Sequence, residues 1–339
     1  MLYVTTRNNA DIFTANHPLN KDRAEDGGAY VPFKLPRLDG DFLKEMVEIP
    51  FNHRLAKVLN LLLGTKITGW ELDVAIGRQA VRVSSMPHRV MLGQMWHNAG
   101  GCFENLCNDV ARLLRKDEGS TEWIEIAVRM ACLTALMSEL CADDRGMVDV
   151  AVPSGDFSGV MAAWYCRAAG LPIGNIIVGC CENAALWDLI CKGELRTGQM
   201  ADSTITPLCD EIVPKNLERL VFACGGTREV ERYLDACRRG QWYYPGNDVL
   251  KHMRKGLHIR VVGQKRVRFT IPNVYTANRQ ILGPYDALSY SALLDHRAAT
   301  GENRPALILS ERSPSRDAEA VADAMGIPVE TLEQRLRLN

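Results

Sequence analysis

The chain has 339 residues and 47% of them are hydrophobic, which suits one large two-lobed α/β domain or two ordinary domains. Lysine and arginine total 40 against 41 aspartates and glutamates, so the composition excludes a global attraction to nucleic acid or to anionic membranes. The N-terminal residues lack the pattern of a secretory signal, and no apolar run is long enough to predict a membrane span.

The first third of the chain predicts turns followed by helices. Asp26-Gly27-Gly28 indicates a tight turn that leads into a short extended segment. Residues 41–64 have helical spacing of apolar side chains, with an interruption at Pro50 and a stop near Gly64. A further helical segment covers residues 67–81, and residues 81–83 predict a short strand before a loop.

That loop, His97 to Asn105, contains two adjacent glycines and leads into a helix predicted over residues 103–114. Two interpretations are open: an ordinary loop-to-helix junction, or a helix start whose free N–H groups favour an anion. A second helix, over residues 121–141, has a wide apolar stripe typical of core packing.

The clearest α/β pattern begins at Val148. A strand over residues 148–152, a loop of small residues, a helix over 160–169 and a strand over 175–181 predict a βαβ crossover in a parallel sheet. Ligands of α/β proteins usually bind at such a loop. The prediction for the C-terminal part is a strand over residues 306–310 and a helix over 315–325.

Residues 249–285 contain no acidic residue, and residues 259–271 resemble a β-hairpin that turns near Gly263. The basic side chains of this segment either bind an anion or discourage pairing at a solvated sheet edge; they are Lys251, Arg254, Lys255, Arg260, Lys265, Arg266 and Arg268. Only two aromatic residues could stack on bases, so RNA binding is not expected.

The 11 cysteines include no C-x-x-C pair, and no zinc-ligand spacing is visible. We therefore expect no metal site, buried reduced thiols and a cytoplasmic location.

Five short motifs follow one another in a fixed order along the chain: Tyr3-Val4-Thr5-Thr6-Arg7, Asp26-Gly27-Gly28-Ala29-Tyr30-Val31-Pro32, Val152-Pro153-Ser154-Gly155-Asp156-Phe157-Ser158-Gly159, Thr204 to Asp210, and Asn216-Leu217-Glu218-Arg219-Leu220. They resemble the Y-x-S-T-R, D-G-G-L-Y-V-P, V-P-S-G-N-F-G-D, T-x-S-x-x-M-D and N-x-E-R-L motifs of threonine synthases. The resemblance covers most of the chain. It implies the tryptophan synthase β-like fold (fold type II of pyridoxal-phosphate enzymes), a three-layer α/β sandwich with a parallel sheet.

Threonine synthases convert O-phosphohomoserine and water to threonine and phosphate, and pyridoxal phosphate forms a Schiff base with the lysine of H-G-P-T-x-A-F-K-D. Residues 97–105 match this motif at His97 and Phe103, whereas Glu104 stands at the lysine position and Asn105 at the aspartate position. A carboxylate cannot form an imine. Glu104 could still act as a general base, with His97 and Asn105 as the other candidate catalytic residues.

The resemblance also assigns the cofactor contacts. The phosphate loop corresponds to Ser154, Gly155, Asp156, Phe157, Ser158 and Gly159, and the residue facing the pyridine nitrogen corresponds to Glu311. Asp156 places a negative charge where a phosphate would lie, and two like charges 4 Å apart repel by about 4 kcal/mol in a protein-like dielectric. A carboxylate at position 311 could serve a pyridinium.

The family's S-G-N-T-G loop, which holds the substrate carboxylate, has no counterpart in residues 106–147. The predicted organisation is therefore an N-terminal threonine-synthase-like region over residues 1–80, a reduced small domain over 81–147 and a large α/β domain over 148–339.

Three hypotheses follow. The chain could be a homologue without pyridoxal phosphate that binds a small molecule, and the candidate ligands are an amino acid or a phosphorylated metabolite, including anions. Such a protein could also act as a partner protein, either by forming a homo-oligomer or by forming a complex with an active homologue. It could be an enzyme that uses Glu104 without a Schiff base. It could also be a pyridoxal-phosphate lyase that uses another lysine, such as Lys192 or Lys215.

Overall fold

The computed structural model describes residues 1–98, 100–115, 119–140 and 146–338. Its strands are β1 (Leu2–Thr5), β2 (Phe13–Thr14), β3 (Tyr30–Pro32), β4 (Arg82–Met86), β5 (Val90–Gln94), β6 (Val148–Pro153), β7 (Ile173–Cys180), β8 (Leu195–Arg196), β9 (Trp242–Tyr243), β10 (Leu257–Val261) and β11 (Ala306–Ser310). None of the helices in the described ranges is long and apolar enough to cross a membrane.

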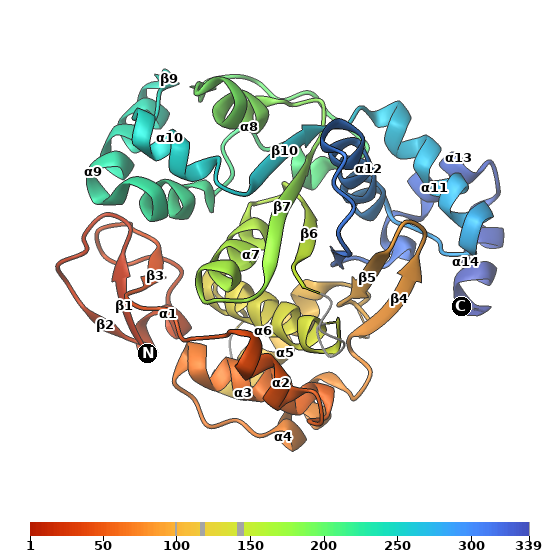
Figure 1. Cartoon of the computed structure of the whole chain (residues 1–339), viewed down its shortest axis with the longest axis horizontal. Coiled ribbons are helices and arrows are strands. Elements are labelled where there is room, and N and C mark those ends of the chain that lie inside the picture. Colours follow the sequence, from red (N-terminus) through yellow and green to blue (C-terminus); the bar gives the residue numbers. More distant parts are fainter. Residues whose placement is uncertain (99, 116–118, 141–145, 339) are drawn as a thin grey trace.

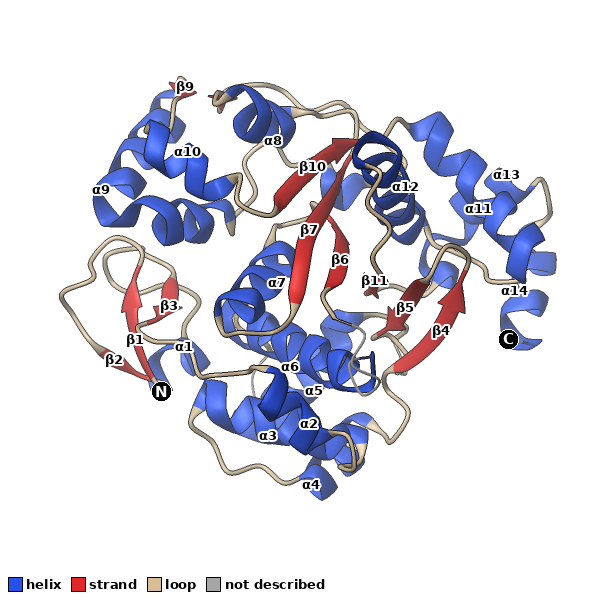
Figure 2. Ribbon diagram, viewed as in Figure 1, coloured by secondary structure: helices blue, strands red, loops and turns tan. Residues whose placement is uncertain are grey.

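Helices account for most of the remaining chain (Figure 2). The α-helices are α1 (Asn16–Asn20), α2 (Gly40–Met46), α3 (Phe51–Leu63), α4 (Gly69–Ile76), α5 (Phe103–Arg115), α6 (Glu122–Leu140), α7 (Ser158–Ala168), α8 (Ala185–Trp187), α9 (Leu217–Arg239), α10 (Asn247–Met253), α11 (Gln264–Asn278), α12 (Pro284–Thr300), α13 (Ala318–Met325) and α14 (Val329–Leu338). A π-helical turn (Asp188–Lys192) and two 3₁₀ turns (Pro207–Cys209 and Pro314–Asp317) complete the helical segments.

A six-stranded sheet in the order β10-β7-β6-β11-β5-β4 forms the centre of the molecule (Figure 1). Its strands are parallel except for β4, which pairs antiparallel with β5 at the edge. The predicted crossover is confirmed, because α7 connects the parallel neighbours β6 and β7. The strand β5 was not predicted.

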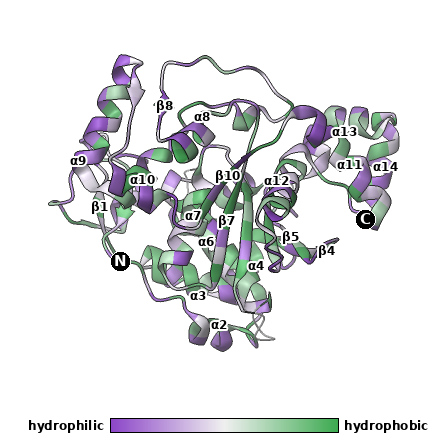
Figure 3. Cartoon of the chain, turned by 45° about the horizontal axis from the view of Figure 1, so that its top comes forward, coloured by the Kyte–Doolittle hydropathy of each residue, from purple (hydrophilic) through white to green (hydrophobic). Residues whose placement is uncertain are grey.

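Helices cover both faces of this sheet, as the three-layer prediction requires. Val150 and Val152 of β6 pack with α6 and α7, whereas Ala151 between them packs with α12 on the other face. This alternation follows from the two-residue period of a strand. Figure 3 shows hydrophobic residues gathered on the central strands, and hydrophilic residues on outer helices such as α9.

A separate three-stranded sheet, β2-β1-β3, is anchored to the start of α9. Glu218 accepts a hydrogen bond from Thr6 and forms ion pairs with Arg7 and Arg23, at 3.2 and 2.9 Å. Gly27 has a φ of +74° and lies under Arg7, where a Cβ would be 2.5 Å from a guanidinium nitrogen. Motifs that carry the family resemblance therefore hold this sheet in place.

Most of the predicted helices and strands are confirmed with small shifts of their ends. The helix predicted over residues 67–81 ends at Ile76, because Gly77 takes a φ of +78°. The end of the helix predicted over residues 121–141 reaches beyond the described residues, as does Ala99 of the predicted loop. Seven of the ten described cysteines are buried as expected, whereas Cys224 and Cys237 are half-buried and Cys191 is exposed.

The hairpin predicted over residues 259–271 is wrong. Residues 257–261 form β10, which pairs parallel with β7, and residues 264–278 form helix α11. Val267, Ile271 and Val274 are buried at the three- and four-residue spacing of a helix face. Some of the basic side chains of this segment are engaged locally: Arg254 donates to two backbone carbonyls, and Arg268 pairs with Asp323.

Candidate functional site

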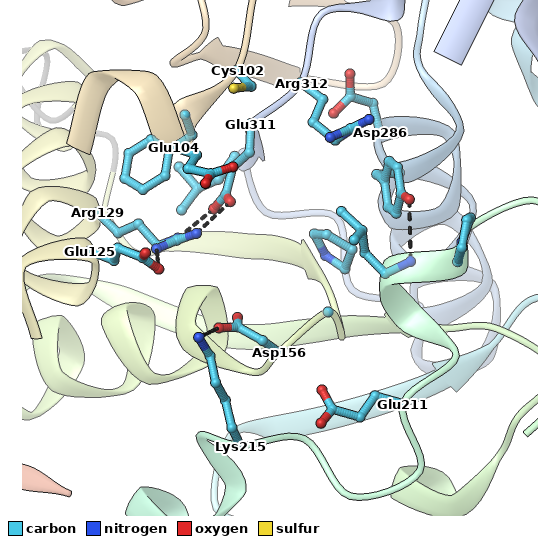
Figure 4. A pocket seen from close by; sticks show the side chains of 17 residues that line it. Cys102, Glu104, Glu125, Arg129, Asp156, Glu211, Lys215, Asp286, Glu311 and Arg312 are labelled. Atoms are coloured by element: carbon cyan, nitrogen blue, oxygen red, sulfur yellow. Dashed lines mark hydrogen bonds and ion pairs between the residues drawn. The ribbon is translucent and has the colours of Figure 1, made fainter. Parts of the chain in front are cut away.

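A cavity of about 550 Å³ opens at the carboxyl ends of β6 and β11 (Figure 4). The starts of α5 and α12 and the 3₁₀ turn at residues 207–209 complete its wall. In α/β proteins this edge of the sheet is the usual place for a ligand. Its apolar lining residues are Phe103, Pro153, Pro207, Leu208, Tyr285 and Leu309.

Glu104 reaches the cavity from the first turn of α5. The loop before this helix is fixed to the segment after β11, because Phe103 donates its N–H to the Glu311 carbonyl at 2.7 Å and Ser313 donates to the Gly101 carbonyl. Gly101 has a φ of +62°, which this close approach of two backbones requires. Glu104 itself is exposed and forms no hydrogen bond or ion pair with another described residue.

Asp156 lies in the loop between β6 and α7, where its carboxylate caps the helix start. Its Oδ1 accepts hydrogen bonds from the backbone N–H (3.0 Å) and the hydroxyl of Ser158. Its Oδ2 is 3.3 Å from Lys215 Nζ and accepts a hydrogen bond from Asn216. Burial alone would raise the pKa of Asp156, but the charge of Arg129 and the Ser158 bonds bring it below its usual value.

Arg129 is the central cation of the cavity wall. Its guanidinium donates two hydrogen bonds of 2.7 Å to the two carboxylate oxygens of Glu311 and stacks 4.2 Å from the Phe103 ring. Burial opposes the charge of Arg129, whereas Glu311 raises its pKa above the usual value. Helix α6 is thereby linked to the end of β11 by a bidentate ion pair.

Three further carboxyl groups line the same cavity. Burial raises the pKa of Asp286 to about 7, although Ser310 donates a hydrogen bond to it. Burial also raises the pKa of Glu125 and of Glu211. Asp286 is therefore a carboxyl group of the cavity that exchanges a proton near neutral pH, which is a property of general acids and bases.

The structure brings some of the predicted site residues together and separates others. Glu104, Gly155, Asp156 and Glu311 line the cavity, and a Cβ on Gly159 would lie 3.7 Å from Glu311. Ser154 and Phe157 are buried in the phosphate-loop segment, where Phe157 takes a φ of +70°. This unfavourable angle for a phenylalanine sets the direction in which the loop enters α7.

His97 and Asn105 do not line this cavity. His97 lies in a separate depression with Arg82 and Trp96, where its Nε2 is 3.0 Å from Gln94. Burial and the charge of Arg82 lower the pKa of His97 to about 4, so its imidazole is neutral at pH 7. Asn105 is half-buried beside Gly100.

Of the two alternative lysines, only Lys215 lines the cavity. Lys192 is exposed and pairs with Asp188 at 2.7 Å. Burial opposes the charge of Lys215, but Asp156 and the neighbouring glutamates raise its pKa, so the amine is held protonated. No group of three or more histidine, cysteine or acidic side chains in the described part of the chain could hold a metal ion.

Sequence reasoning missed Arg129, Glu125, Glu211 and Asp286. A signal was present for Arg129, which is the only basic residue within the apolar helix α6. A charge in such a position must be paired when it is buried, so an acidic partner in the site could have been anticipated. Asp286 lies in the first turn of α12 and Glu211 in the segment before α9, and nothing in their local sequence places either residue beside the cavity.

Comparison with known proteins agrees with this architecture. Residues 2–79 match the family model described as threonine synthase N terminus. The threonine synthase of Pseudomonas aeruginosa is 26% identical over 271 residues, which are 75% of this chain and 57% of that protein. The threonine synthase-like 2 protein of Rattus norvegicus is 24% identical over 65% of this chain and 46% of its own length. The chain thus spans about half the length of the curated relatives it matches.

The solved structure of pyridoxal-phosphate-bound threonine synthase from Brucella melitensis superposes with a TM-score of 0.86 at 16% identity, covering 96% of this chain and 92% of that one. The fold is therefore fold type II of the pyridoxal-phosphate enzymes. Together with the match of residues 2–79 and the related sequences, this fold confirms the predicted resemblance to threonine synthases.

Proposed function

We propose that this threonine synthase-like protein does not use pyridoxal phosphate and binds a small molecule in the cavity beside Glu104. The observation that carries the proposal is that charged side chains of this chain stand at the positions assigned to the family's Schiff-base lysine and cofactor contacts. The proposal includes the assignment of Glu104 to the lysine position and of residues 154–159 and Glu311 to the cofactor contacts.

The donor chemistry at these positions does not fit the cofactor. A Schiff base needs an amine, and Glu104 offers a carboxylate. A phosphate at the start of α7 needs free N–H groups, whereas the Ser158 N–H is already bonded to Asp156. The position opposite the pyridine nitrogen holds Glu311, whose two oxygens are taken by Arg129. The residues at these positions therefore do not support a reaction step through pyridoxal phosphate.

An enzyme without a Schiff base is the second candidate. The observation in its favour is that Glu104 faces the cavity with no ion-pair partner among the described residues, so it is available to move a proton. A lyase that uses Lys215 is less well supported, because the ion pair with Asp156 holds that amine protonated and a protonated amine is not a nucleophile.

The test is phosphate release from O-phosphohomoserine with added pyridoxal phosphate, combined with thermal-shift measurements on amino acids and phosphorylated metabolites. The proposal predicts no phosphate release and stabilisation by at least one ligand. Turnover of any ligand that is lost in Glu104→Gln would support the second candidate. Phosphate release that depends on the cofactor and on Lys215 would overturn the proposal.

The cytoplasmic location and a homo-oligomer or complex with an active homologue belong to the same proposal. They rest on the expectation that the cysteines are reduced and on the family resemblance. Light scattering of the purified chain, alone and mixed with an active threonine synthase, tests the assembly.

A further inference from the structure

We propose that a groove between α7, α10 and the start of β10 binds a phosphate group, either as the free ion or as part of a phosphorylated small molecule. The groove has a volume of about 380 Å³. None of the residues that line it also lines the cavity beside Glu104. The inference is therefore independent of the function proposed for that cavity.

Arg167, in the last turn of α7, provides a guanidinium that is held in one position at this groove. Its two Nη atoms donate hydrogen bonds to the carbonyls of Gly256 and Lys255, at 2.7 and 2.8 Å. Its guanidinium carbon lies 4.8 Å from the centre of the Trp164 ring. Gly256 has a φ of +74°, and a Cβ there would lie 2.3 Å from Arg167 Nη1, so glycine is required for this contact.

The positive charge of the groove is not balanced by the chain itself. Neither Arg167 nor Lys255 forms an ion pair with another described residue, and no described acidic side chain lines the groove. Burial lowers the pKa of Arg167, because a cation loses its hydration there without gaining an opposite charge. An anion beside the guanidinium would offset this loss. Lys255 and His252 are exposed at the same groove and supply further donors to it.

Trp164 gives a second observation, which does not depend on these charges. It is 7% exposed and lines the groove, yet its indole Nε1 donates no hydrogen bond to a described residue. This nitrogen remains open to solvent, so a ligand in the groove can reach it. An indole N–H can only donate, and in a buried tryptophan it usually has a partner. The groove therefore calls for a ligand that carries an acceptor atom.

A phosphate group fits these donors better than a nucleic acid does. Arg167 covers the ring of the buried Trp164, so the indole offers no free face on which a base could stack. A phosphate has several acceptor oxygens and can bond to donors from α7 and α10 together. This assigns an anion to one part of the basic segment over residues 249–285, in which Arg254 and Arg268 are engaged elsewhere.

The experiment is isothermal titration calorimetry of the full chain at low ionic strength with inorganic phosphate, glycerol 3-phosphate, acetate and glycerol. We expect both phosphate compounds to bind more tightly than acetate and glycerol not to bind. Tighter binding of glycerol 3-phosphate than of inorganic phosphate would identify a phosphorylated organic molecule as the ligand. Equal or weaker binding would identify the free ion.

Variants locate the binding site. Trp164→Phe removes the N–H and keeps a ring, and it should weaken phosphate binding by about tenfold. Lys255→Gln should weaken it by about fivefold, because an exposed charge contributes less. Lys265→Gln, an exposed lysine of the same basic segment on α11 outside the groove, is the matched control and should bind as the wild type does. Lys215→Met, in the cavity beside Glu104, should also bind as the wild type does.

Circular dichroism of each variant establishes that it is folded before titration. Failure of both phosphate compounds to bind, tighter binding of acetate, or wild-type affinity in folded Trp164→Phe or Lys255→Gln overturns the inference. Loss of phosphate binding in Lys215→Met would place the anion in the cavity beside Glu104 and would overturn it as well.

Discussion

Replacement of Arg129 by methionine tests whether the ion pair with Glu311 holds the cavity wall together. The two atoms of each bond are 2.7 Å apart, which corresponds to a Coulomb attraction of about 6 kcal/mol at an effective dielectric constant of about 20. Desolvation of the buried guanidinium offsets much of this attraction. The variant also leaves Glu311 and Glu125 without their cation, so we expect it to lose about 3–5 kcal/mol of unfolding free energy.

The assay is urea unfolding of Arg129→Met, Glu311→Met and the double variant. The two substitutions should be coupled by about 2 kcal/mol, with the double variant more stable than the sum of the single effects predicts. Arg238→Met, which breaks an exposed pair on α9, serves as the control and should change stability by no more than about 0.5 kcal/mol. A coupling energy near zero between Arg129 and Glu311 would refute the reasoning.

Three further predictions concern stability. In the folded chain Asp286 keeps its proton up to about pH 7, whereas in the unfolded chain an aspartate releases its proton near pH 3.8. The contribution of Asp286 to the unfolding free energy is therefore fully present below about pH 4. It falls by about 4 kcal/mol as the pH rises to 7. Asp286→Asn should remove that part of the pH dependence of urea unfolding, and an unchanged slope would contradict the assignment. Gly69→Ala should lower the unfolding free energy by about 2 kcal/mol, because the added Cβ would lie 2.7 Å from the His53 Cα. An unchanged melting temperature in thermal melts would contradict this prediction and show that α3 and α4 can separate freely. Thr68→Ala removes the capping box of α4 and should lower stability by about 1 kcal/mol, with Thr68→Ser retaining most of it in the same melts.

The sequence predicted the central architecture because its signals are local. The strand-loop-helix-strand pattern after Val148 and the apolar periodicity of α6 each lie within one segment. The hairpin of β4 and β5 was hidden, because its loop places His88 and Arg89 at positive φ, where glycine or asparagine would have indicated a turn. Residues 264–271 were misassigned because a basic run with scattered apolar residues fits a strand or a helix about equally well.

The site could be predicted only where the family resemblance supplied an alignment. Glu104, Asp156 and Glu311 are far apart along the chain and meet at one sheet edge, as the shared fold requires. Glu311 and Asp156 are paired with Arg129 of α6 and with Lys215 of the segment before α9, and no local pattern connects these cations to the two acids. His97 was expected beside Glu104, but it lies seven positions earlier in the chain and lines another depression.

The central claim is that this chain does not use pyridoxal phosphate, and borohydride trapping tests it most directly. The full chain is mixed with one equivalent of the cofactor, its visible absorbance is recorded, and the mixture is reduced, digested and mapped by mass spectrometry. The account predicts no Schiff-base band and no stoichiometric adduct at any single lysine. One cofactor fixed per chain at Lys215, with loss of the band in Lys215→Met but not in Lys192→Met, would contradict it.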